Sequence, residues 1–264
     1  MKNLFSVKGK VALVTGGSRG IGEMIAQGFV ENGVKTYITA RNEDDLNATA
    51  TRLSEFGECI AIVADLSTLK GIEAAVSVIK KREPKLDILV NNAGTAWGAP
   101  FSDFPEKGWD KVMNLNVKSP FFLTQQLYPL LKQSATKADP SRVINIASIN
   151  GINHPRTSNY SYSASKAAVI QMTRHLAADL VQDNVNINAI APGFFLSKLT
   201  AFLVDDDQQK FADDRIPKQR MGEAEDIAGT AIYLCSRASS WITGQTIVLD
   251  GGVIASSGYG EYQD

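Results

Sequence analysis

Short apolar runs alternate with longer amphipathic segments along most of the chain. The apolar runs lie at 11–15, 36–39, 59–64, 86–90, 142–147, 185–190 and 245–249. The segments with helical periodicity lie at 21–31, 42–56, 70–81, 106–132, 161–180 and 223–234. Strands that alternate with helices form a parallel sheet covered on both faces, and such buried strands are typically almost wholly apolar. The pattern predicts an α/β fold: one Rossmann domain over residues 1–264, with a doubly wound, seven-stranded parallel sheet and helices on both faces.

Two segments depart from this regular alternation. Residues 194–220 contain no clear strand and are acidic at 205–207. We interpret this stretch as a lid over a ligand site, and a variable surface excursion is the alternative. Pro120 lies inside the predicted helix at 106–132 and predicts a kink there.

Composition narrows the class of protein. The chain has 264 residues, of which 44% are hydrophobic and 21% charged, as expected for a globular domain that needs no disulfide or metal to fold. A net charge of −1 gives no basic footprint for nucleic acid, and no apolar run approaches the length of a membrane span. Two histidines do not support a histidine-rich metal centre, so we expect no metal. Cys59 and Cys235 lie in apolar stretches, which favours buried thiols. Residues 1–10 lack the apolar core of a signal peptide, and we therefore expect a cytoplasmic protein.

A glycine-rich turn joins the first predicted strand to the first predicted helix. Glycines allow a sharp turn and close approach to a pyrophosphate, and a helix N-terminus presents N–H groups to it. A tight turn without a ligand is the alternative. The candidate cofactor-binding residues in this turn are Gly16, Ser18, Arg19, Gly20, Ile21 and Gly22.

The residue after the second predicted strand bears on the choice of dinucleotide. An acidic residue there would pair with a free ribose 2′-hydroxyl, but the chain has Arg41. A guanidinium matches a phosphate group, and Arg19 in the turn could reach the same group. We therefore expect NADP(H). The alternative is that Arg41 is a solvated residue paired with the acids at 43–45.

Three side chains could supply proton-transfer chemistry. Tyr162 and Lys166 are four residues apart on one helix face, and Ser148 follows the fifth predicted strand. A phenol titrates near pH 10, and a nearby ammonium would lower its pKa. Ser148 could donate a hydrogen bond to a carbonyl oxygen as charge develops on it. The alternative is an ordinary half-exposed tyrosine above a surface lysine.

These motifs, in this order, resemble the short-chain dehydrogenase/reductase family over essentially the whole chain. The resemblance rests on residues 15–22, Asp65, 91–94, Asn116, Ser148, Tyr162, Lys166, 192–193 and 250–252. It implies that Asn116 holds a water in a proton relay with Lys166, which also binds the nicotinamide ribose beside Tyr162. It further implies cofactor contacts from Asp65, Leu66, Asn92, Ala93, Gly94, Pro192, Gly193, Phe195 and Ser197. Members usually form homotetramers, or homodimers, through the helices around Asn116 and Tyr162.

Within that family the chain is most similar to NADPH-dependent 3-oxoacyl-[acyl-carrier-protein] reductases of the rhamnolipid-biosynthesis type. The resemblance implies a 3-oxoacyl substrate linked to acyl carrier protein or CoA. Trp97, Phe194 and Phe195 would suit an acyl chain, although ordinary packing explains them equally well. A sugar, polyol or small diketone reductase is one alternative. A non-catalytic, dinucleotide-sensing regulatory protein is another.

Overall fold

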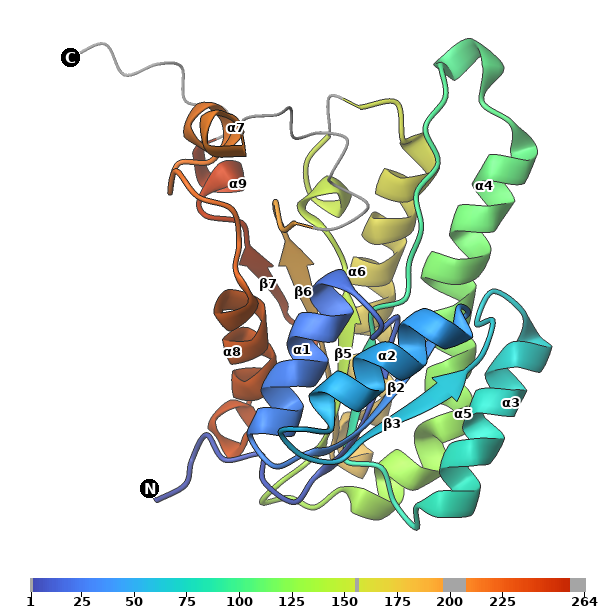
Figure 1. Cartoon of the computed structure of the whole chain (residues 1–264), viewed down its shortest axis with the longest axis vertical. Coiled ribbons are helices and arrows are strands. Elements are labelled where there is room, and N and C mark those ends of the chain that lie inside the picture. The colour runs from blue at the N-terminus through green and yellow to red at the C-terminus, as the bar shows by residue number, and fades with distance from the viewer. Residues whose placement is uncertain (1, 155–156, 197–207, 257–264) are drawn as a thin grey trace.

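The computed structural model describes residues 2–154, 157–196 and 208–256, which form an α/β fold (Figure 1). Its sheet is parallel and has seven strands, as the sequence predicts, and the strand order is β3-β2-β1-β4-β5-β6-β7. The strands are β1 (Val11–Thr15), β2 (Lys35–Ala40), β3 (Cys59–Val63), β4 (Ile88–Asn91), β5 (Ser141–Ile146), β6 (Val185–Pro192) and β7 (Thr246–Leu249). β1 pairs with β2 on one side and β4 on the other, so the strand order reverses between β1 and β4. Ligands bind such sheets at the carboxyl ends of the strands beside this reversal.

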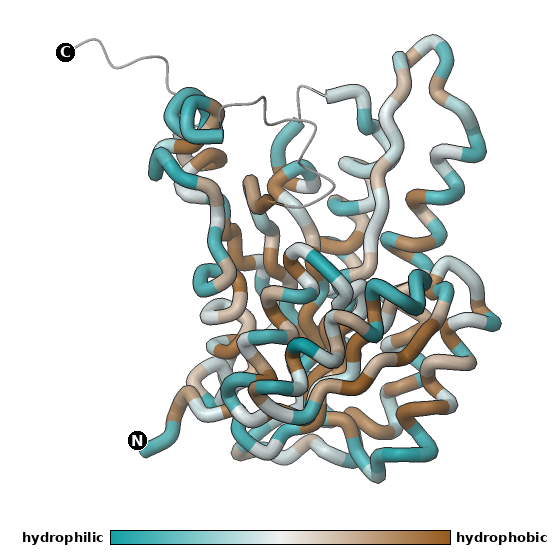
Figure 2. Tube along the Cα trace, in the orientation of Figure 1, coloured by the Kyte–Doolittle hydropathy of each residue, from teal (hydrophilic) through white to brown (hydrophobic). Residues whose placement is uncertain are grey.

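Helices cover both faces of the sheet, and successive strand residues face opposite layers. In β1, Ala12 and Val14 belong to one buried cluster, whereas Leu13 belongs to the other. The first cluster packs under α1 (Gly20–Glu31), α2 (Glu43–Leu53) and α8 (Ala224–Cys235). The second packs under α3 (Leu69–Arg82), α5 (Ser119–Ser134) and α6 (Tyr160–Leu180). Hydrophobic residues accordingly concentrate along the strands, whereas hydrophobic and hydrophilic residues alternate along the helices (Figure 2).

The helix predicted at 106–132 is interrupted. It consists of α4 (Glu106–Met113), a π-helical segment at Asn114–Lys118 and then α5. Pro120 lies in the first turn of α5. Because proline has no N–H, it cannot donate the α-helical hydrogen bond to the carbonyl oxygen of Asn116. The predicted disturbance at Pro120 therefore takes the form of a π-bulge that ends just before it, a feature that often marks functional sites.

The remaining described elements are short. They comprise four 3-10 helices, η1 (Phe101–Asp103), η3 (Ile149–Gly151), η4 (Val181–Asp183) and η6 (Arg237–Ser239), together with α7 (Gln208–Arg215) and α9 (Val253–Ser256). In the predicted lid, Phe195 bridges to Gly222, and Ala212 and Ile216 form a small apolar cluster with Met221. Residues 197–207 lie outside the described residues, so the lid stays a prediction, as does the domain span of 1–264.

The sequence leads to expectations about the cysteines, metal binding and membrane spans of the chain. Cys59 and Cys235 are buried thiols, as predicted. Within the described ranges, no His, Cys, Asp and Glu side chains form a group that could hold a metal ion. None of the helices that the structure describes has the length and apolar character needed to cross a membrane.

Candidate active site

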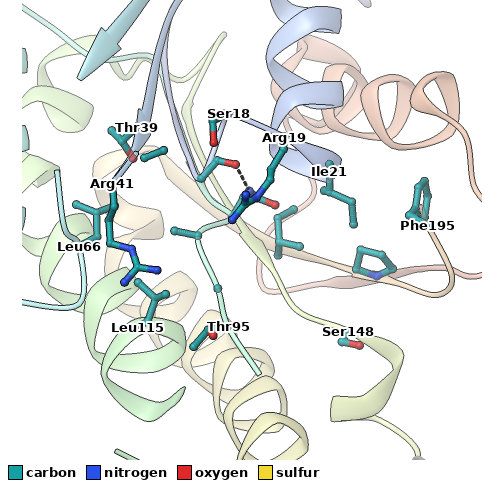
Figure 3. Close-up of a pocket in the computed structure, with 18 of the residues that line it drawn as sticks. Ser18, Arg19, Ile21, Thr39, Arg41, Leu66, Thr95, Leu115, Ser148 and Phe195 are labelled. Atoms are coloured by element: carbon teal, nitrogen blue, oxygen red, sulfur yellow. Dashed lines mark hydrogen bonds between the residues drawn. The ribbon is translucent and has the colours of Figure 1, made fainter. Parts of the chain in front are cut away.

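A cleft of about 680 Å³ opens at the carboxyl edge of the sheet, where the strand order reverses. Arg41 and Leu66 lie at one end of it, and Ser148 and Phe195 lie towards the other (Figure 3). Seventeen of the predicted site residues line this cleft: Gly16, Ser18, Arg19, Gly20, Ile21, Arg41, Asp65, Leu66, Asn92, Ala93, Gly94, Ser148, Tyr162, Lys166, Pro192, Gly193 and Phe195. Gly22 and Asn116 are not among the lining residues, and Ser197 lies outside the described residues.

The glycine turn is held tightly against the loop after β4. The Thr15 hydroxyl oxygen accepts hydrogen bonds from the backbone N–H groups of Asn92 and Ala93, both at 2.9 Å. Gly16 has φ +66°, and a Cβ on it would lie 3.0 Å from the Ala93 Cα and from the Asn92 amide nitrogen. A side chain at Gly22 would overlap the Gly16 carbonyl, so Gly22 serves the close packing of the turn. The turn thus forms a cradle of bare backbone beside the N-terminus of α1, which suits a pyrophosphate.

Two arginines lie at the end of the cleft near β2. Arg19 and Arg41 both line it, together with Asn42 and Asp45 from the start of α2. The Arg19 guanidinium lies 3.9 Å from the Asp45 carboxylate, and both side chains are about half exposed. The alternative weighed from sequence paired the acids at 43–45 with Arg41. The ion pair present here instead involves Arg19, and a 2′-phosphate would meet two cations at this end.

Ser148, Tyr162 and Lys166 converge at the opposite end. Ser148 follows β5, and its hydroxyl oxygen accepts a hydrogen bond from the Asn150 N–H at 3.2 Å. The Ser148 side chain also forms a hydrogen bond with the Tyr162 phenol. The Lys166 ammonium donates to the Ile146 carbonyl oxygen at 2.7 Å and lies 5.5 Å from the centre of the Tyr162 ring. The spacing of four residues on α6 therefore brings both side chains to the end of β5.

Burial sets the direction of the pKa shifts of Tyr162 and Lys166. It raises the pKa of the Tyr162 phenol, and the hydrogen bond from Ser148 acts in the opposite direction. Burial also lowers the pKa of Lys166 from 10.5 to about 8. Burial therefore outweighs any lowering of the phenol pKa by the ammonium, and the net shift is opposite to the one expected from sequence. The ammonium is turned to the Ile146 carbonyl, and removal from water disfavours the phenolate.

Asn116 lies behind the cleft in the π-helical segment. Its side-chain oxygen accepts a hydrogen bond from the Thr95 N–H at 2.9 Å. Its amide donates to the Thr95 carbonyl at 2.9 Å and to the Ser165 hydroxyl at 3.0 Å. The amide thus joins the loop after β4 to α6, next to Lys166. The Asn116 backbone carbonyl receives no hydrogen bond from Pro120, and the predicted proton relay stays a prediction.

Sequence reasoning missed several residues of the cleft. Thr95 and Leu115 line it, although neither belongs to a motif with its own chemistry. Asn42 was detectable in principle, because an Asn followed three residues later by an acid is typical of a helix start. Its side chain does cap α2, accepting the Asp45 N–H at 2.9 Å. Only the fold reveals that this helix start borders the cleft.

Comparison with known proteins identifies the relatives of this chain. A family model described as "Enoyl-(Acyl carrier protein) reductase" matches residues 16–254. The chain is 48% identical to the rhamnolipids biosynthesis 3-oxoacyl-[acyl-carrier-protein] reductase of Pseudomonas aeruginosa, over 96% of this chain and 99% of that protein. The chain belongs to the short-chain dehydrogenase/reductase family. As a short-chain dehydrogenase/reductase with this cleft, it is an NADP-dependent oxidoreductase that acts on CH–OH or C=O groups, which confirms the predicted enzyme class and cofactor.

A solved structure and a second sequence relative of this short-chain dehydrogenase/reductase show the range of the family. The Pseudomonas aeruginosa RhlG/NADP active-site complex superposes with a TM-score of 0.92 at 47% identity, covering 96% of this chain and 99% of that one. The 2-dehydro-3-deoxy-D-gluconate 5-dehydrogenase of Dickeya dadantii is 39% identical over 96% of this chain and 98% of that protein. Relatives with acyl and with sugar substrates therefore share this fold.

Proposed function

We propose that this enzyme reduces a 3-oxoacyl thioester to a 3-hydroxyacyl thioester with NADPH. The observation that carries the proposal is the convergence of Ser148, Tyr162 and Lys166 at one end of a cleft whose other end holds Arg19 and Arg41. Of the two relatives compared in sequence, the one with the higher identity is named for 3-oxoacyl substrates. The thioester would be presented on acyl carrier protein or on CoA.

The residues of the cleft fit NADPH. The bare glycine turn suits the pyrophosphate, Arg19 and Arg41 suit the 2′-phosphate, and Lys166 suits the hydroxyls of the nicotinamide ribose. When bound, NADPH supplies the hydride that the carbonyl carbon accepts. The other residues that we assign to cofactor binding are Gly16, Ser18, Gly20, Ile21, Gly22, Asp65, Leu66, Asn92, Ala93, Gly94, Tyr162, Pro192, Gly193, Phe195 and Ser197.

In this proposal the protein handles the proton. Because burial raises its pKa, the Tyr162 phenol stays protonated near neutral pH and can donate its proton to the carbonyl oxygen. The Ser148 hydroxyl donates a hydrogen bond to the same oxygen. The Lys166 ammonium then lies close enough to stabilise the phenolate that Tyr162 becomes. We assign the return of a proton to a water held at the backbone carbonyl of Asn116.

Two of the three aromatic residues considered for an acyl chain are engaged elsewhere. Trp97 packs on Gly108 and lies under the Lys111 ammonium at 5.3 Å, and Phe194 packs edge-to-face on Phe211. Phe195 alone of the three lines the cleft. A sugar or polyol reductase is therefore the second candidate, favoured by the identity to the gluconate-type dehydrogenase.

A substrate panel tests the proposal. We expect kcat/KM for acetoacetyl-CoA and longer 3-oxoacyl-CoA esters with NADPH to exceed that for 5-keto-gluconate and L-sorbose. A preference for the ketoses would overturn the thioester assignment and favour the second candidate. Tyr162→Phe should abolish turnover while NADPH still binds with nearly unchanged affinity. Full activity in that variant would overturn the catalytic assignment, and binding without any turnover in the unmodified protein would favour a dinucleotide sensor.

We also propose a cytoplasmic homotetramer. Trp109 on α4 and Phe121 on α5 are 42% and 38% exposed, on the helices that the family resemblance assigns to subunit contacts. Light scattering of the purified protein tests the assembly, and a monomer would exclude it.

A further inference from the structure

The acid at the 2′-phosphate end of the cleft has no role in the function proposed above. Asp45 lines the cleft beside Arg19 and Arg41, and its carboxylate lies 3.9 Å from the Arg19 guanidinium. A carboxylate facing a phosphate pocket repels the doubly charged group and also occupies a cation that the group needs. This placement therefore weakens the binding of NADP(H), which carries the 2′-phosphate, and not the binding of NAD(H).

We propose that Asp45 is a specificity-determining residue that competes with the cofactor 2′-phosphate for Arg19 and so limits the preference for NADP(H) over NAD(H). The inference rests on the proposed assignment of Arg19 and Arg41 to the 2′-phosphate. Arg19 has two anionic partners in this scheme. It pairs with Asp45 when no 2′-phosphate is near, and it must leave that carboxylate to meet a phosphate.

The geometry of the ion pair favours exchange between the two partners. At 3.9 Å the contact is longer than a charge-assisted hydrogen bond, and the side chains of Arg19 and Asp45 are 56% and 51% exposed. Exposed pairs of this kind contribute little to stability, so breaking the pair is cheap. The guanidinium can therefore turn to a stronger anion while the carboxylate stays nearby.

Hydrogen bonds of the Asp45 backbone hold this residue beside the cleft independently of its side chain. The Asp45 N–H donates to the Asn42 side chain at 2.9 Å, which caps α2. The Thr49 hydroxyl lies 3.0 Å from the carbonyl oxygens of both Ser18 and Asp45, which joins α2 to the glycine turn. Since these anchors use backbone atoms of Asp45, Asp45→Asn removes the charge and leaves the anchors intact.

Asp44 offers a matched control. It is an exposed acid in the same first turn of α2, but it does not line the cleft. Asp44→Asn changes the net charge of the protein by the same amount. Any effect of Asp45→Asn that exceeds the effect of Asp44→Asn therefore belongs to the local contact with Arg19.

Calorimetric titration with 2′,5′-ADP and with 5′-ADP tests the inference without turnover. Asp45→Asn should tighten 2′,5′-ADP binding by roughly threefold to tenfold at low salt, should leave 5′-ADP nearly unchanged, and should lose most of the gain at high salt. Asp44→Asn should change either ligand by less than about twofold. In kinetics, Asp45→Asn should raise the ratio of kcat/KM for NADPH to that for NADH with kcat nearly unchanged.

Three results would overturn the inference. Unchanged or weaker 2′,5′-ADP binding in Asp45→Asn would mean that Asp45 does not compete, or that it helps to position Arg19. An equal gain in 2′,5′-ADP affinity in Asp44→Asn would mean that the net charge of the protein, and not the contact with Arg19, causes the effect. Arg41→Ala separates this failure from failure of the site itself, because it should weaken 2′,5′-ADP but not 5′-ADP. If Arg41→Ala and Arg19→Ala both leave 2′,5′-ADP binding unchanged, both the assigned 2′-phosphate site and the inference about Asp45 are wrong.

Discussion

Lys166 is buried, and because burial disfavours its charged form we expect the folded protein to be less stable than one without this charge. Lys166 is 5% exposed, and among the described residues its ammonium has one hydrogen-bond acceptor, the Ile146 carbonyl. The fall of its pKa from 10.5 to about 8 corresponds to a penalty of about 3 kcal/mol for holding the charged form in the folded protein. Lys166→Met keeps most of the apolar stem and removes the charge.

The expected gain in the free energy of unfolding is about 2 kcal/mol near neutral pH. The penalty of about 3 kcal/mol disappears, and the loss of one hydrogen bond offsets about 1 kcal/mol of it. For a chain of this size that corresponds to a rise in Tm of roughly 4–8 °C. The same variant should lose turnover, because no ammonium is left to stabilise the Tyr162 phenolate.

The pH dependence gives the decisive signature. A lysine whose pKa is lowered by folding destabilises the protein fully below its folded pKa, and the penalty declines as pH rises from about 8 towards 10.5. The penalty should fall to about half between pH 7 and about pH 9.5, so the advantage of Lys166→Met should fall from about 2 kcal/mol to about 0.5 kcal/mol. Taking the difference between two proteins at each pH cancels the titration of other groups.

Urea unfolding followed by far-UV circular dichroism, at one fixed protein concentration, measures this difference. Lys70→Met on the exposed start of α3 is the control, and its effect should stay within about 0.5 kcal/mol at both pH values. A Lys166→Met protein that is less stable than the unmodified one, or whose advantage is independent of pH, would refute the reasoning.

Two further substitutions probe the ends of β5. In Gly151→Ala, the new Cβ would lie 2.6 Å from the Lys166 backbone and would displace the turn that carries Ser148. We therefore expect kcat to fall by roughly tenfold to a hundredfold. NADPH affinity, measured by fluorescence titration, should change little. Unchanged kcat would contradict this. Arg142→Leu removes the donor to three backbone carbonyls and leaves Asp139 with one cation fewer. It should therefore lower the free energy of unfolding, measured in urea, by about 3 kcal/mol. Its kcat should stay within about twofold. A stable but inactive variant would contradict this second expectation.

The sequence predicted the order of elements well because each signal in it is local. Near-continuous apolar runs and helical periodicity act within a few residues, and the structure has a counterpart for every predicted strand. The same holds for Tyr162 and Lys166, whose spacing on one helix fixes a common face. The disturbance near Pro120 was also predictable, although its form as a π-bulge was not.

What the sequence did not predict depends on contacts between distant segments. The ammonium of Lys166 could have faced Tyr162, but it is turned to the carbonyl of Ile146, twenty residues away, and burial then sets both pKa values. Asp45 was considered as a partner of Arg41 and lies instead beside Arg19. In each case local spacing left two partners within reach, and the packing of separate elements decides between them.

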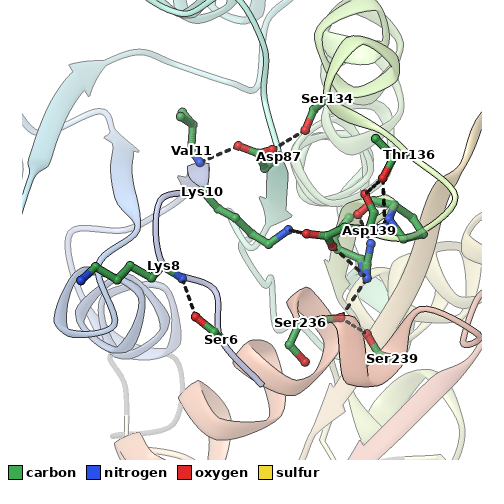
Figure 4. A network of polar contacts seen from close by, with 12 residues as sticks. Ser6, Lys8, Lys10, Val11, Asp87, Ser134, Thr136, Asp139, Ser236 and Ser239 are labelled. Atoms are coloured by element: carbon green, nitrogen blue, oxygen red, sulfur yellow. Dashed lines mark hydrogen bonds and ion pairs between the residues drawn. The ribbon is translucent and has the colours of Figure 1, made fainter. Parts of the chain in front are cut away.

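The two ends of β5 show how one strand serves stability and chemistry separately. At its start, Arg142 is almost fully buried and joins α8 through the Leu234 and Ser236 carbonyls, while Asp139 pairs with Lys10 at 2.6 Å (Figure 4). These contacts lie inside the protein and tie the start of β5 to α8 and to the segment before β1. At the other end, burial leaves Lys166 and Tyr162 disfavoured in their charged forms. Burial lowers the pKa of Arg142 as well, but its guanidinium donates to three backbone carbonyls. The Lys166 ammonium donates to one carbonyl among the described residues, so it gains more from a partner that arrives with the ligand.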